Sequence, residues 1–174
     1  NTIFAFCPIT WGPRESCRAL NLLRPSLWIT SDNYLGESRT NTIKATCDTA
    51  AGALEPVLLR GNGTTFRSWK ELIDEAPSLS DTQATEYAGF GLDPLEIAVT
   101  SGTTGVPKGV VHAHDTVLET VQSTIDRQGI SSADVIHLAL PVGHPFGYLY
   151  GVRCALQAGG TLVMQESWDP YRMA

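Results

Sequence analysis

The 174-residue sequence is poor in basic side chains and has no long apolar run. Lys and Arg number 12 against 18 Asp and Glu, which gives a formal net charge of −6. An acidic chain of this kind argues against a nucleic-acid partner, which favours a basic patch. No apolar stretch approaches the ~20 residues that cross a bilayer, so the sequence predicts no membrane span.

Cysteines at metal-binding spacing are also missing. The four cysteines lie far apart, with no CxxC motif and no histidine spacing that suggests zinc; they are Cys7, Cys17, Cys47 and Cys154. We therefore expect free thiols in a reducing compartment, and without a targeting pattern the cytoplasm is the default location. The chain does not begin with Met and opens directly on a strand-like run, so we expect a segment of a longer protein.

Apolar runs alternate with helical patterns along the chain. Strand-like runs include PVLLR at 56–60, LEIAVT at 95–100, DVIHLAL at 134–140 and TLVMQ at 161–165. Helical patterns cover 13–23, a weaker stretch at 42–53, the capping-box segment 68–75, and the Gly-terminated segment 147–160. This alternation predicts an α/β fold, a layered and largely parallel sheet with flanking helices.

The strongest helical pattern covers 114–129. Val117, Leu118, Val121 and Ile125 share one stripe, which we interpret as a packing face. Asp115 or Thr116 is expected to cap the start, and Gly129 to end the helix. Residues 77–94 are polar and interrupted by Gly and Pro, so they read as a linker-like loop.

The stretch VTSGTTGVPKGVVHAH at 99–114 has a composition that suits neither a regular strand nor a helix. Its glycines allow close approach of the backbone to an anion, its Ser and Thr hydroxyls are donors, and Lys108 adds a point charge. This combination predicts a phosphate-binding loop, against the plainer reading of a surface turn. It is not a Walker A loop, because Pro107 precedes Lys108 and Gly109 follows it, and it lacks the Rossmann GxGxxG spacing.

The same stretch resembles the phosphate-binding signature of the adenylate-forming (AMP-binding) superfamily. The matching positions are Thr100, Ser101, Gly102, Thr103, Thr104, Gly105, Pro107, Lys108, Gly109 and His114. A second block, LALPVGHPFGYLYG at 138–151, resembles the next motif of the superfamily, with Pro141 followed by His144 and Gly147. The segment after it is most similar to acyl-CoA synthetases and other acid–CoA ligases.

The resemblance implies an ATP-dependent ligase that converts a small carboxylic acid to an acyl-adenylate and then to a coenzyme A thioester. By resemblance, Thr100, Ser101, Gly102, Thr103, Thr104 and Gly105 would hold the ATP phosphates, with Thr104 near Mg²⁺. Lys108 would neutralise the leaving pyrophosphate, and His144 would sit beside the acid carboxylate and the α-phosphate. Phe146, Gly147 and Tyr148 would shape one wall of the acid pocket, and His114 would be structural.

Several parts of the superfamily pattern are absent from these residues. The adenine-binding motif, the ribose-binding Asp and the small C-terminal lid domain with its catalytic Lys do not appear. We therefore interpret 1–174 as part of the large N-terminal domain, with no catalytic residue, no CoA site and no activity of its own. A non-catalytic nucleotide-binding or scaffold protein remains an alternative, as do a peptide-synthetase adenylation domain and a luciferase-like enzyme.

Overall fold

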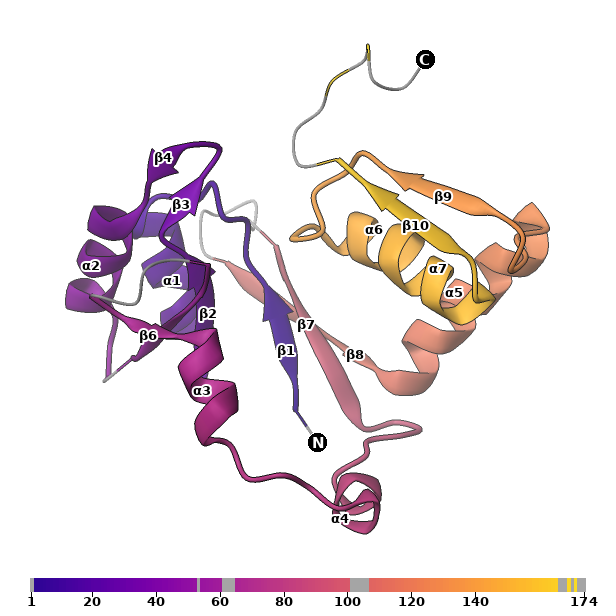
Figure 1. The fold of residues 1–174 in the computed structure, drawn as a ribbon, viewed down its shortest axis with the longest axis horizontal. Coiled ribbons are helices and arrows are strands. Elements are labelled where there is room, and N and C mark those ends of the chain that lie inside the picture. The colour runs from indigo at the N-terminus through magenta and orange to yellow at the C-terminus, as the bar shows by residue number, and fades with distance from the viewer. Residues whose placement is uncertain are drawn as a thin grey trace. The chain divides into compact units, whose positions relative to one another are not determined.

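Strands and helices alternate along most of the chain, and the longer strands pair in parallel (Figure 1). The computed structural model describes residues 2–52, 54–60, 65–100, 107–165, 169 and 171. The predicted α/β class is confirmed. The chain divides into two compact units, one made of Asn1–Pro8, Gly89–Ala98 and Val110–Ala174, the other of Ile9–Ala88 and Val99–Gly109.

The first unit contains most of a three-stranded sheet with β7 at its centre. Its order is β1 (Phe4–Phe6), β7 (Pro94–Thr100) and β8 (Lys108–Ala113). Strands β1 and β7 are parallel, with Phe4 opposite Glu96. Strands β7 and β8 are neighbours joined by a connection too short for a parallel crossover, so they form a hairpin.

The rest of this unit is a parallel strand pair with helices against it. Strands β9 (Val135–Leu138) and β10 (Thr161–Met164) run side by side. Between them lies one continuous helical segment, made of α6 (Pro145–Gly147), the π-helix η1 (Tyr148–Arg153) and α7 (Cys154–Ala158). Figure 1 shows this segment and α5 (His114–Gln128) on one face of the pair. The core consists of Leu95, Val117, Val121, Ile125 and Cys154.

Helix α5 confirms one sequence expectation about its ends and corrects another. Gly129 ends it in the left-handed conformation, with φ of 64°, as predicted. The expected cap by Asp115 or Thr116 is wrong, because the cap position is Ala113 and no side chain bonds there. Instead, the backbone N–H groups of His114 and Asp115 donate to carbonyls of residues 93 and 91, at 3.1 and 2.9 Å. A tertiary contact thus satisfies the first donors of the helix.

The predicted packing stripe of α5 is confirmed at three of its four positions. Val117, Val121 and Ile125 are buried in the core, whereas Leu118 is 41% exposed. Including Leu118 was therefore wrong, because it lies next to the stripe but faces away from the core of this unit.

The second unit is built on a parallel sheet of β2 (Trp28–Ser31), β5 (Pro56–Arg60) and β6 (Arg67–Ser68), in that order. Helices α1 (Pro13–Leu23) and α2 (Thr40–Thr49) pack against each other, and β3 (Asn33–Tyr34) pairs with β4 (Glu37–Ser38). The buried apolar residues are Cys17, Ala19, Leu20, Ile43, Val57 and Leu58. Helix α2 begins and ends earlier than the predicted 42–53.

Two capping boxes begin the short helices that follow. Helix α3 (Trp69–Glu75) has the predicted box, in which Ser68 and Glu71 satisfy each other's backbone N–H groups. Ser80 and Gln83 make a second box at the start of α4 (Asp81–Glu86), which lies inside the segment expected to be a loop. Among the described residues, no helix is long and apolar enough to span a membrane.

Candidate functional site

The base of the predicted phosphate loop is held together by a side-chain contact. Strand β7 ends at Thr100 and β8 begins at Lys108, and Oγ1 of Thr100 donates to the carbonyl oxygen of Lys108 at 3.4 Å. Both residues are exposed. The structure therefore brings together two of the residues that the sequence assigns to ATP. Ser101, Gly102, Thr103, Thr104 and Gly105 lie outside the described residues.

This contact gives different roles to Thr100 and Lys108, the two residues at the ends of the loop. The Thr100 hydroxyl bonds to the chain itself, so its observed role is to close the base of the loop. The carbonyl of Lys108 takes part in that closure, whereas its exposed ammonium has no hydrogen bond or ion pair with the described residues and is available to an anion. A single exposed cation at the mouth of a hydroxyl- and glycine-rich loop suits a phosphate group.

His144 belongs to the first compact unit, where it begins the helical segment after β9. Its backbone N–H donates to the Pro141 carbonyl at 3.0 Å, and its own carbonyl accepts from Tyr148 N–H at 3.1 Å. Nδ1 of its ring accepts the backbone N–H of Phe146 at 3.1 Å, so His144 is itself the helix cap. A ring that accepts at Nδ1 and is neutral carries its proton on Nε2. The side chain is exposed, so this N–H donor is open to a ligand.

Gly147 explains why the His-x-x-Gly motif needs its glycine. A Cβ at this position would overlap the carbonyl oxygen of Pro141, so the backbone approach requires glycine. Gly143, in the same turn, is less confined, since a Cβ there would sit 3.5 Å from the Cys7 carbonyl oxygen. The turn from Pro141 to Gly147 is thus closed on itself and packed against the end of β1.

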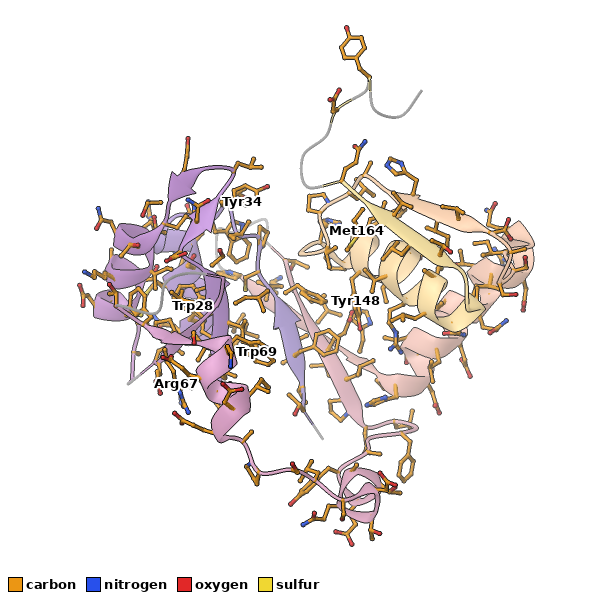
Figure 2. All side chains as sticks on the ribbon, viewed as in Figure 1. Trp28, Tyr34, Arg67, Trp69, Tyr148 and Met164 are labelled. Atoms are coloured by element: carbon orange, nitrogen blue, oxygen red, sulfur yellow. The ribbon has the colours of Figure 1, made fainter. Side chains whose placement is uncertain are left out.

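Aromatic rings surround the start of the helical segment. The Tyr148 ring lies 5.4 Å from the ring of Phe4 and 4.7 Å from that of Phe6. Figure 2 shows Tyr148 between strands β1 and β7 and the helical segment. Phe146 pairs with Tyr150 at 4.6 Å, and Phe146 is 53% exposed. The exposed Phe146 ring beside His144 could contact an apolar acid, as the resemblance implies.

Sequence reasoning missed a charged group beneath these rings. Glu96 is only 3% exposed in the centre of β7. Burial raises its pKa above the usual carboxyl range, and the nearby charges of His112 and Arg153 oppose that rise. The signal was present in the sequence, as a lone glutamate in the apolar run LEIAV. Cys7 at the end of β1 is not a nucleophile at neutral pH, because burial raises the pKa of its thiol to about 11.

The part of the chain that the structure describes holds no group of three or more His, Cys, Asp and Glu side chains suited to a metal ion. Thr104, which the sequence places near Mg²⁺, lies outside that part. A metal bridged mainly by the phosphates of a nucleotide needs few protein ligands, which is compatible with a loop of hydroxyls.

A known protein family matches this chain along nearly its whole length, and individual relatives match part of it. The family described as AMP-binding enzyme matches residues 2–174. Rice (Oryza sativa subsp. japonica) 4-coumarate–CoA ligase 1 is 32% identical over 126 residues, which are 68% of this chain and 22% of that protein.

A second relative is a Mycobacterium tuberculosis CoA ligase, named for a propanoyl group on a methyl-dioxo-octahydroindene ring. It is 36% identical over 104 residues, which are 59% of this chain and 20% of the relative. The chain thus spans about a fifth of the length of these relatives.

The fold also matches solved structures. The ATP-bound structure of MatB from Rhodopseudomonas palustris superposes with a TM-score of 0.73 at 20% identity, covering 98% of this chain and 31% of MatB. That likeness supports the fold. The family match, which includes both the loop at 100–109 and the turn at His144, shows that the chain belongs to the AMP-binding enzyme family.

Proposed function

We propose that the protein activates a small carboxylic acid with ATP and transfers the acyl group to coenzyme A. A carboxylate oxygen attacks the α-phosphorus, the bond to the β-phosphate breaks, and pyrophosphate leaves. The thiol sulfur then attacks the acyl carbon of the adenylate and AMP departs. The observation that carries this proposal is the complete loop motif at 100–109 in a member of the AMP-binding enzyme family whose relatives are named as CoA ligases.

The residues of this chain divide the first step between them. Charge builds on the departing pyrophosphate, so positioned donors and cations lower the barrier. Lys108 supplies a positive charge, the hydroxyls and amides from Ser101 to Gly105 would hold the phosphates, and Thr104 would be the residue that helps to hold Mg²⁺. The closed base between Thr100 and Lys108 supports this assignment, because it keeps the lysine at the mouth of the loop.

His144 acts on the acid side of the same step. Its Nε2–H is a donor for the carboxylate or for an oxygen of the α-phosphate, because Nδ1 is occupied as the acceptor of the Phe146 N–H. Phe146 and Tyr148 contribute the apolar wall of the acid pocket. The CoA site and the catalytic lysine would be supplied by residues other than these 174.

The location follows the same proposal. The four cysteines are free, which suits a reducing compartment. We therefore place the protein in the cytoplasm, and imaging of a tagged complete gene product tests this placement.

The test of the activity is acid-dependent exchange of labelled pyrophosphate into ATP, made on the complete product of the gene. A panel of aliphatic, alicyclic and aryl acids, each with and without CoA, separates the two steps. Exchange that depends on one acid class, with thioester formed only when CoA is added, supports the proposal. A folded protein that binds ATP but exchanges with no acid would favour the non-catalytic alternative.

A further inference from the structure

Three aromatic rings hold the helical segment on strand β1 in the first compact unit. Phe4 and Phe6 are two residues apart on β1, so both side chains project from one face of the sheet. Their ring centroids lie 5.2 Å apart. The ring of Tyr148, the first residue of the π-turn η1, packs against both, at 5.4 and 4.7 Å (Figure 2). The pairs are edge-to-face or tilted, which is the arrangement that aromatic rings favour.

The backbone of Tyr148 connects this aromatic cluster to His144. The Tyr148 N–H donates to the carbonyl oxygen of His144 at 3.1 Å, four residues back along the chain. Tyr148 is thus held by its ring on β1 and by its N–H on His144. Because a single helical turn separates the two residues, a movement of the Tyr148 ring away from β1 would also displace His144.

The turn before Tyr148 has little freedom to absorb such a movement. A Cβ at Gly147 would overlap the Pro141 carbonyl oxygen, so the backbone there is already in close contact. Gly143 stands on the end of β1, where a Cβ would lie 3.5 Å from the Cys7 carbonyl oxygen. The turn therefore packs on β1 at both of its ends, through the backbone at Gly143 and through the ring at Tyr148.

We propose that Phe6 is a positioning residue, which acts through Tyr148 to hold His144 where its ring meets the acid and the α-phosphate. Phe6 makes the shorter of the two ring contacts with Tyr148, and it carries no group that could take part in the reaction. Its influence on the reaction must therefore pass through the residues it contacts. This part of the inference rests on the proposed function. The holding of the turn follows from the packing alone and is measured separately.

Two substitutions at Phe6, made in the complete gene product, test the inference. Phe6→Leu keeps an apolar side chain and removes the aromatic contact with Tyr148. Phe6→Met is a second variant, because a flexible side chain fills the irregular space that a ring leaves. Phe90→Leu is the matched control, since it makes the same substitution in the same compact unit at a ring that is 76% exposed.

Amide hydrogen exchange measures the holding of the turn without any assay of activity. The relevant donors are the N–H groups of His144, Phe146 and Tyr148, which are hydrogen-bonded inside the turn. We expect their exchange to speed up about tenfold in Phe6→Leu and to keep the wild-type rate in Phe90→Leu. Unchanged exchange at these amides in Phe6→Leu would overturn the inference, and so would an equal acceleration throughout the chain, which would indicate general destabilisation.

A double-mutant cycle on the reaction rate separates positioning from a merely structural role. Acid-dependent pyrophosphate exchange is measured for Phe6→Leu in the wild type and in His144→Asn, which lacks the ring donor. In the wild-type background we expect kcat to fall about tenfold and the KM for ATP to stay within about twofold, because a misplaced donor acts mainly on the transition state.

In the His144→Asn background, Phe6→Leu should cause a further loss of less than about twofold, because the donor that Phe6 positions is already gone. The same tenfold loss in both backgrounds would show that Phe6 acts independently of His144, and would overturn the inference.

Failure of the proposed function gives a different result from failure of this inference. If the wild type exchanges pyrophosphate with no acid, the proposed function fails, and hydrogen exchange at the three amides still decides whether Phe6 holds the turn. Should Phe6→Leu not fold, Phe6→Met carries both measurements.

Discussion

The backbone N–H of Phe146 donates to Nδ1 of His144 at 3.1 Å, so the imidazole of His144 caps the helix that follows it. One ring nitrogen is thereby used by the fold, and the other is left as a donor on an exposed side chain. His144 therefore has a structural role, as the helix cap, and a proposed chemical role, as a donor to the substrate. Different substitutions can separate these two roles.

His144→Asn and His144→Ala should therefore differ in stability but not in activity. Asparagine is a good cap acceptor, so His144→Asn should melt close to wild type, whereas His144→Ala should lose about 1 kcal/mol. Both lack the Nε2–H donor, and both should slow acid-dependent exchange on the order of 10²-fold. Thermal melts and pyrophosphate exchange on the complete gene product measure the two effects. An asparagine variant with full activity would contradict the role of the ring.

Lys108→Ala should slow pyrophosphate exchange by roughly 10²–10³-fold, because it removes the cation beside the departing phosphates. Lys70→Ala is the matched control, since Lys70 is an exposed lysine on α3 whose partner is Asp74, one helical turn away. The control should exchange at the wild-type rate. An unchanged rate in Lys108→Ala would remove this lysine from the site.

Gly147→Ala should destabilise the protein by about 1–3 kcal/mol, because the new methyl group overlaps a backbone carbonyl that side-chain motion does not relieve. Gly143→Ala in the same turn should have little effect, since its nearest neighbour would be at ordinary contact distance. Denaturant melts of both variants test the comparison. Equal free energies of unfolding for the two variants would show that the turn accommodates the methyl group at Gly147 without strain, and would contradict the prediction.

The free energy of unfolding of the wild type should fall as the pH rises because Glu96 ionises. Glu96→Gln should lack this part of the pH dependence. Burial raises the pKa of Glu96 in the folded state, against the opposing charges of Arg153 and His112. The folded protein therefore binds the proton more tightly than the unfolded chain does. Stability from this group is complete below the unfolded pKa near 4.5 and is lost as pH rises through the folded pKa.

Denaturant melts across that pH range measure this loss. The free energy of unfolding of Glu96→Gln, relative to wild type, should increase from acid to neutral pH. Glu71 gives a contrast, because hydrogen bonds from Ser68 lower its pKa, so its contribution is present at neutral pH and is lost on acidification. A wild type and Glu96→Gln with parallel pH curves would exclude a raised pKa at Glu96.

Local patterns in the sequence determined the parts of this protein that depend on near neighbours. The capping box at Ser68, the end of α5 at Gly129 and the order of strands and helices follow from contacts within a few residues. The loop motif at 100–109 indicated the family in the same way, because a phosphate loop is a continuous segment of chain. The second capping box, at Ser80, had an equally local signal that the linker-like reading of 77–94 passed over.

Tertiary structure decided the features that depend on segments far apart in the chain. Ala113 replaces the expected cap because carbonyls of residues 91 and 93 reach the start of α5. Glu96 lies on a face that Phe4 of the neighbouring strand β1 and Tyr148 of η1 help to cover, and no local pattern brings Phe4 to Tyr148. The π-turn likewise has no signature in a helical periodicity, since one inserted residue leaves most of the pattern intact. The sequence thus determined which residues are available for the proposed chemistry. Packing between distant segments decided that Glu96 is buried near Tyr148.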